Sequence, residues 1–303
     1  MSPAATGRSA RGELLGIALV LGAAACFSAL DTTTKHVGAS VPLLMALWFR
    51  YAFQAVATAT VVIPLRGARV LRTRHLPFQI LRGLLLLTSS LLAFTSLRYM
   101  PVGEFTAIVM MAPLAVTLLA ATVLKEHVSP FRCSLVAGGF LGTLVIMRPG
   151  GESFSWAMLL PLGLVASNAW FQVLTSRMAR TEDPLTTHLY TGWVGTLVAS
   201  VTLPSAWASI PDPWLWASLA LMGAMGTIGH FLLILAYRNA PAATLTPYLY
   251  AQIGFSMLGG WLVFAHLPSS SSFAGMALIA LCGAAGAWAR VREARLPLQA
   301  ARA

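Results

Sequence analysis

Ten apolar runs, each long enough to cross the hydrocarbon core of a bilayer as a helix, dominate this chain of 303 residues. A core about 30 Å thick needs about 20 helical residues per crossing. Charged residues or clusters of Pro, Gly and Ser separate the runs, and prolines stand at or next to the start of seven of them, where a missing N–H group costs nothing. We predict spans at roughly 13–37, 42–64, 77–99, 101–124, 130–148, 155–177, 185–209, 213–238, 241–264 and 270–289.

The composition excludes a soluble protein. Apolar residues make up 57% of the chain and charged residues 10%, whereas soluble domains have about 45–50% and about 25%. Disordered, collagen-like and coiled-coil chains would be polar, periodic in glycine or rich in charge. The predicted fold class is therefore an all-α integral membrane protein with ten transmembrane helices, joined by connections too short to form another domain.

The net charge of +11 would suggest a nucleic-acid partner in a soluble protein, so the positions of the basic residues decide what it means. With the N-terminus in the cytoplasm, fifteen Lys and Arg residues fall inside and only Lys35, Arg98 and Arg148 fall outside. This is a strong positive-inside bias. It predicts a multi-pass protein of the inner or plasma membrane with both termini in the cytoplasm, including a basic tail at 290–303, and it requires no nucleic acid.

The chain also contains an internal repeat. At an offset of 142 residues Pro42 matches Pro184, and at an offset of 140 Arg98 matches Arg238 and Pro101 matches Pro241. We predict a first repeat at 13–148 (spans 1–5) and a second at 155–289 (spans 6–10). Because each repeat has an odd number of spans, two copies of one fold must insert with opposite orientations. Inverted repeats are typical of secondary transporters, which expose one site near the midplane alternately to each side.

Three segments resemble the drug/metabolite transporter superfamily, specifically its EamA-type members: 97–106 (LRYMPVGEFT), 124–129 (LKEHVS) and 138–142 (GGFLG). The resemblance implies ten spans, two inverted EamA repeats and a cavity lined mainly by spans 1, 3, 4, 6, 8 and 9. The second half departs from the family pattern: His266 stands where the counterpart of Glu126 would be, and Ile253 replaces the proline that matches Pro113.

Polar, aromatic and methionine side chains gather near the middle of the spans that the resemblance assigns to the cavity. A few polar groups among aromatic and Met side chains describe a pocket for an organic molecule. The alternative is hydrogen bonding between helices, which is common for Ser, Asn and Gln in membranes. The candidate cavity residues are Phe27, Ser28, Ser90, Phe94, Met110, Asn168, Trp170, Gln172, His230, Tyr248 and Gln252.

Several charged residues lie inside the predicted spans, where an ionisable side chain is costly. Asp31, Arg50 and Glu104 share one level near the outer mouth. One interpretation is a structural ion pair, either Asp31 with Lys35 or Asp31 with Arg50; the other is a gate or an arginine that recognises a carboxylate. Arg82, about 7 Å from the inner end of its span at 1.5 Å per residue, is expected to snorkel to the interface.

These features predict a secondary transporter that moves a small neutral or zwitterionic organic metabolite by alternating access, with export as the expected direction. The zwitterionic or neutral class follows because no carboxylate lies at the depth of His230 to neutralise a cationic substrate. We expect its apolar portion to stack near Phe94, Tyr248 or Trp170, and His230 either carries a coupling proton or donates a hydrogen bond as neutral imidazole.

The alternatives are an uptake carrier for a vitamin or nucleotide-like metabolite and, from other classes, a membrane-embedded enzyme or a channel. An enzyme is disfavoured because the chain has no His-Glu-x-x-His, Gly-x-Ser-x-Gly or P-loop motif. No cofactor and no metal site is predicted, since the cysteines are isolated in apolar stretches. The partners expected are the substrate and the bilayer, and the oligomeric state is not predicted.

Overall fold

The computed structural model describes residues 10–122, 129–149, 155–178, 181–239, 245 and 248–300. This part of the chain is helical and contains no strand. Its α-helices are α1 (Ala10–Val37), α2 (Leu43–Arg66), α3 (Leu76–Tyr99), α4 (Val102–Val109), α5 (Ala112–Thr122), α6 (Pro130–Met147), α7 (Leu160–Met178), α8 (Pro184–Ala206), α9 (Pro213–Asn239), α11 (Ala251–Phe264) and α12 (Ser270–Ala300). Short 3₁₀-helices η1 (Gly67–Leu71) and η2 (Trp156–Leu159) precede α3 and α7.

The prediction of an all-α membrane protein with ten spans is confirmed, since each predicted span contains helix in the described ranges. One span is interrupted. The segment predicted at 101–124 forms α4 and α5, which are separated by a turn at Met110 and Met111. Pro113 follows this turn, and its missing N–H group removes a hydrogen bond that a continuous helix would need.

Seven of the helices are apolar and long enough to cross a membrane by themselves. Helix α8 has 23 residues but is not among the seven, because polar side chains interrupt its apolar sequence. The buried residues of α8 include Thr187, His188 and Thr191. Helix α8 therefore turns polar groups toward the protein interior.

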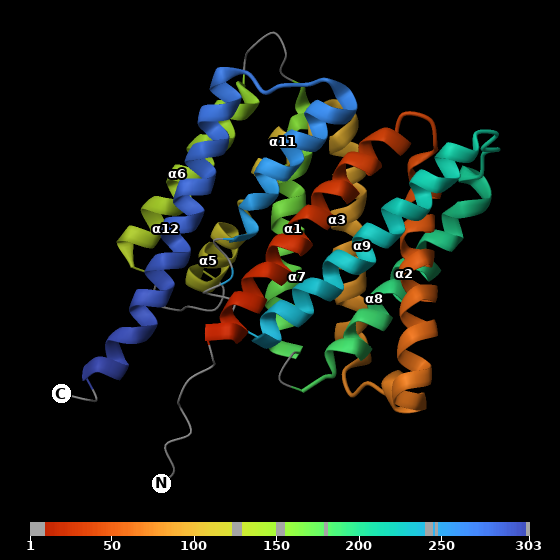
Figure 1. The fold of residues 1–303 in the computed structure, drawn as a ribbon, viewed down its shortest axis with the longest axis horizontal. Helices are drawn as coiled ribbons and strands as arrows, with labels where there is room; N and C mark the ends of the chain where they lie inside the picture. Colours follow the sequence, from red (N-terminus) through yellow and green to blue (C-terminus); the bar gives the residue numbers. More distant parts are fainter. Residues whose placement is uncertain are drawn as a thin grey trace.

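The helices pack in pairs that link the first half of the chain to the second (Figure 1). Helix α2 packs against α8, α4 against α11, and α6 against α12. The α1–α9 contact in one direction corresponds to the α7–α3 contact in the other. In the same way, the α2–α9 contact corresponds to the α8–α3 contact. Exchanging the first five spans for the last five leaves this list of pairs unchanged. Two halves with one fold would pack in this way.

Both ends of the described chain lie on one side of the molecule. Figure 1 shows the start of α1, the end of α2, the start of α8 and the end of α12 at the same edge. The α6–α12 pair forms one end of the bundle and the α2–α8 pair the other. Helices α1, α3, α7 and α9 lie between these two pairs.

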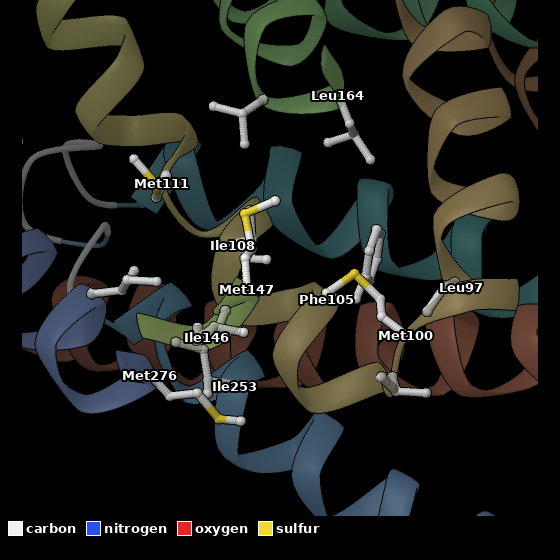
Figure 2. Close-up of a cluster of buried hydrophobic side chains, with 14 of the residues drawn as sticks. Leu97, Met100, Phe105, Ile108, Met111, Ile146, Met147, Leu164, Ile253 and Met276 are labelled. Carbon is white, nitrogen blue, oxygen red and sulfur yellow. The ribbon is translucent and has the colours of Figure 1, made fainter. Parts of the chain in front are cut away.

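The two larger of the apolar cores hold most of the bundle together. One lies around α4, α6, α11 and α12 and includes Phe105, Ile108 and Ile146 (Figure 2). The other lies between α1, α2, α3 and α9 and includes Tyr51 and Phe94. Burial of such side chains in a membrane protein stabilises helix contacts mainly through close packing.

Candidate functional site

Arg50 of α2 points into the protein and is 7% exposed. Its Nη1 donates a short hydrogen bond to Ser90 Oγ on α3. Ser90 donates its own hydrogen to the Leu86 carbonyl oxygen at 2.9 Å. Because a hydroxyl has one hydrogen, Tyr51 Oη, 2.8 Å from Ser90 Oγ, must donate as well. Ser90 thus accepts two hydrogen bonds and holds the Arg50 side chain against α3.

Arg82 of α3 is buried as well, and the expectation that it snorkels to the interface is wrong. Its Nε donates to Thr175 Oγ1 on α7 at 2.6 Å. Its Nη1 donates to the Thr187 carbonyl oxygen at 3.0 Å and to Thr191 Oγ1, both on α8. The guanidinium carbon lies 4.4 Å from the centre of the Phe171 ring. Arg82 stays inside because α7 and α8 provide neutral acceptors and an aromatic face there.

Two histidines lie between these arginines. His188 of α8 is buried, and its ring centre is 6.2 Å from that of His230 on α9. The edge of the His230 ring meets Phe27 of α1, with 4.9 Å between ring centres. His188 is close enough to Arg82, and His230 to both Arg50 and Arg82, for the charges to act on the rings. His188 is therefore a second titratable group beside His230.

We call Arg50, Arg82, His188 and His230 the central cationic cluster. It lies among α2, α3, α8 and α9, which come from both halves of the chain. Within the described ranges, no carboxylate oxygen lies within 4.0 Å of either guanidinium, and the one ion pair of a histidine joins His266 to Glu104 at 3.4 Å. The cluster is therefore a site of positive charge that neutral groups of the protein support.

Asp31 of α1 lies in a second polar group, which we call the Asp31 group. Its Oδ2 accepts from Thr106 Oγ1 on α4 and from Gln252 Nε2 on α11, both at 3.3 Å. Thr106 Oγ1 is also 3.0 Å from Ser256 Oγ. The predicted ion pair of Asp31 with Lys35 or Arg50 does not form in the described part of the chain, although Arg50 acts on Asp31 at longer range. Neutral donors occupy the carboxylate instead.

Lys35 is occupied elsewhere, at the end of α3 that the positive-inside pattern places outside. Its Nζ donates to the carbonyl oxygens of Leu97 at 2.7 Å and Met100 at 2.9 Å. These carbonyls carry the partial negative charge of a helix C-terminus, which a cation stabilises. Lys35, Phe264 and His266 line a pocket of about 250 Å³ at this end. Arg50, Asp31 and Lys35 thus belong to three separate arrangements.

The other predicted cavity residues do not meet at the cationic cluster. Phe94 is buried in an apolar core, Met110 packs against the other core at the break between α4 and α5, and Ser28 lines a groove between α1 and α11. Trp170 is 44% exposed and Tyr248 is 38% exposed.

The prediction that Asn168 and Gln172 share a face is confirmed, because Gln172 Nε2 donates to Asn168 Oδ1 at 2.7 Å. This hydrogen bond is internal to α7 and links no second helix. Tyr248 and Gln252, the analogous pair four residues apart, do not bond to each other, since Gln252 reaches Asp31 on α1.

The sequence reasoning missed Arg82 and His188 as interior groups. The signal for them lies in α8, where Thr191 follows Thr187 by four residues and His188 by three, so that the three side chains form one polar stripe. A polar stripe on a membrane helix faces protein or water, so Arg82 had acceptors to bind at its own depth. No three His, Cys, Asp or Glu side chains of the described residues lie together in a way that would hold a metal ion.

Comparison with known proteins identifies relatives over almost the whole length. The model of the EamA-like transporter family matches residues 14–148. The riboflavin transporter of Brucella anthropi is 28% identical over 267 residues, which cover 86% of this chain and 94% of that protein. The S-adenosylmethionine uptake transporter of Rickettsia bellii is 26% identical, with 88% and 90% covered.

A pseudopaline exporter of Pseudomonas aeruginosa is 25% identical, covering 87% of this chain and 93% of that protein. A solved structure, described only as a protein, superposes with a TM-score of 0.63 at 21% identity and covers 93% of this chain and 98% of its own, which shows a shared fold. The matched family model and these full-length relatives agree: residues 14–148 match the EamA-like transporter family, and most of the chain is similar to transporters of small metabolites.

Proposed function

We propose that this protein is a secondary transporter that moves a small organic metabolite across the inner or plasma membrane by alternating access. The observation that carries the proposal is the packing of corresponding helices from the two halves around a shared polar centre. A site built between two related halves can open to each side when one half rocks against the other. Relatives named as transporters, which match most of the chain, support this function.

We further propose that residues 13–148 and 155–289 are two repeats of opposite orientation, with both termini in the cytoplasm. The interrupted spans support this assignment. The turn at Met110 and the turn at Tyr250 are 140 residues apart, which is one of the two offsets of the repeat. Reporters that work only in the cytoplasm should be active after Ala303 and in the loop 66–75. Activity of a reporter that works only outside, at either place, would contradict the orientation.

The proposed substrate is a neutral or zwitterionic metabolite with an apolar or aromatic portion. Phe27, whose ring contacts His230, and Phe171, whose ring faces Arg82, are aromatic groups at the cationic cluster on which such a portion could stack. We propose export as the direction, with uptake of a vitamin-like or nucleotide-like metabolite as the alternative. Relatives named for uptake and for export both exist, so vesicles of known orientation decide the direction.

The test is counterflow in proteoliposomes. Vesicles are loaded with unlabelled riboflavin, S-adenosylmethionine or a mixture of amino acids, and uptake of a labelled trace of the same compound is measured. A carrier accumulates the label transiently because it exchanges internal for external substrate, whereas a channel does not. Protein-free liposomes are the control. Equilibration without transient accumulation would indicate a channel, and chemical conversion of the labelled compound would indicate an enzyme.

A further inference from the structure

The central cationic cluster contains more positive charge than the groups around it neutralise. Arg50 and Arg82 are each less than 9% exposed, and every hydrogen bond that the described residues give them ends on a neutral oxygen. Asp31 acts on this region only from beyond 4.0 Å. A buried charge without a counter-charge is costly and marks a functional site in a membrane protein.

Arg50 also has unused hydrogen-bonding capacity. A guanidinium has five N–H donors, and within the described part of the chain Arg50 uses Nη1 on Ser90 alone. Its Nε is buried and has no acceptor, and the same holds for Nε2 of His188. Ser90 cannot accept more, since Arg50 and Tyr51 both donate to it. Two buried nitrogens at the cluster therefore lack the partner that buried polar atoms normally have.

The backbone of α9 passes close to Arg50 at Gly226. A Cβ added at Gly226 would lie 3.6 Å from both Arg50 Nε and Leu30 Cδ2, an ordinary contact distance. The glycine therefore leaves Nε uncovered on the side of α9, by the width of one Cβ. About one helix turn further along α9, or about 6 Å at 1.5 Å per residue, His230 lies beside His188, and the charges of both Arg50 and Arg82 act on it, so the polar interior extends from Arg50 toward Arg82.

We propose that Arg50 binds an anionic group of the transported molecule, a carboxylate or a phosphate, and that Arg82 keeps the rest of the path positive while His188 and His230 line it as neutral imidazoles. The planar fork of a guanidinium pairs with both kinds of anion in two parallel hydrogen bonds. This inference rests on the proposed transport function and favours zwitterionic or anionic molecules over neutral ones. Ser90 and Tyr51 act as positioning residues that hold the guanidinium in place.

The experiment compares ligands that differ only in the anionic group. Purified full-length protein in detergent is titrated with phenylalanine and phenylalaninol for the carboxylate, and with riboflavin 5′-phosphate and riboflavin for the phosphate; binding is followed by thermal stabilisation and by flavin fluorescence. We expect the anionic member of at least one pair to bind at least about tenfold more tightly, as a bidentate charged contact would give. The pair that responds identifies carboxylate or phosphate as the anion.

Variants then assign this preference to Arg50. In Arg50→Gln the preference should fall below about threefold, while binding of the uncharged member should change little. Arg50→Lys keeps the charge without the fork and should retain an intermediate preference; it also serves if the Gln variant does not fold. Arg148→Gln is the matched control, because it makes the same change at an exposed arginine outside the cluster. In the described part of the chain, Arg148 donates to Ser269.

Two results would overturn the proposal: no preference for the anionic member of either pair in the unmodified protein, or an equal preference in folded Arg50→Gln. Counterflow distinguishes these failures from a failure of the transport function. If the protein exchanges an uncharged compound and no anionic member inhibits this exchange, the transport function is supported and the anion site is excluded. If an anion binds in a way that depends on Arg50 but the protein exchanges none of the ligands, the anion site is supported and the proposed transport function is contradicted.

Discussion

The central cationic cluster and the Asp31 group are two ways of keeping a charge inside a membrane protein. The cluster lies on α2, α3, α8 and α9, and hydroxyl and carbonyl oxygens support its arginines. The Asp31 group lies on α1, α4 and α11, and a hydroxyl and an amide donate to its carboxylate. The two regions carry charges of opposite sign, yet in each of them neutral groups are the hydrogen-bond partners of the charge. The protein keeps its interior charges apart where direct pairing would have cancelled them.

The difference between the regions lies in how firmly each charge is held. Arg82 makes three hydrogen bonds to two helices and faces an aromatic ring. Asp31 accepts two bonds of 3.3 Å, both on one oxygen. Hydrogen bonds to charged groups contribute about 1.5–3 kcal/mol each, so removal of Arg82 should cost more than removal of the Asp31 charge. The predictions below test this ranking.

The largest effect is expected for Arg82→Met. The variant loses the bonds that join α3 to α7 and α8 and leaves Thr175 and Thr191 without their donor, so the unfolding free energy should fall by at least about 3 kcal/mol. The folded fraction after gel filtration and the melting temperature measure this loss. Arg148→Met, which changes an exposed arginine, should behave like the unmodified protein. Normal stability of Arg82→Met would mean that the bonds to the threonines do not hold the cluster.

Close packing beside the two regions should show the same ranking. A Cβ at Gly192 on α8 would lie 3.0 Å from the Ala55 backbone nitrogen and 3.1 Å from its Cα on α2. Backbone cannot rotate away, so Gly192→Ala must separate α2 from α8 and should cost about 2 kcal/mol, within the usual range for overpacking.

Gly259 on α11 is the matched position next to the other region. There a Cβ meets the side chain of Thr32 on α1, which can change rotamer, so Gly259→Ala should cost less than about 1 kcal/mol. Melting temperatures of the two alanine variants give the comparison. If Gly259→Ala lowers the melting temperature more than Gly192→Ala does, the α2–α8 side is not the more rigid of the two.

At Asp31 the charge and the hydrogen bonds can be separated. Asp31→Asn keeps an oxygen that accepts from Thr106 and Gln252, so its unfolding free energy should change by less than about 1 kcal/mol. Asp31→Leu leaves both donors without an acceptor and should cost about 1–3 kcal/mol. Chemical denaturation of the two variants in the same detergent measures the difference. Equal losses for Asn and Leu would mean that the negative charge itself stabilises the fold.

Much of the fold could be predicted from the sequence because a bilayer requires each crossing to be an apolar helix of about 20 residues. The interior of the bundle follows a weaker rule. Asp31 and Arg50 stand at one level, which suggested a pair, but sequence gives no rotation of one helix about its axis relative to another. The short distance from Arg82 to the interface predicted that its side chain reaches the interface. Its side chain stays inside because it binds Thr175, Thr187 and Thr191, on two helices about 100 residues further along the chain. Partners of this kind depend on tertiary packing.

The smallest effect concerns the ion pair that the structure lacks. Residues in contact show coupling energies of about 0.5–3 kcal/mol in a double-mutant cycle, whereas separate residues add to within about 0.5 kcal/mol. Asp31 accepts from Thr106 and Gln252, and Arg50 donates to Ser90. We therefore expect the losses of unfolding free energy for Asp31→Asn and Arg50→Gln to add to within about 0.5 kcal/mol in the double variant, as measured by denaturation of all four proteins. A double variant that is more stable than Arg50→Gln alone would show that the two charges are partners after all. The comparison between the regions would then describe the two ends of one ion pair.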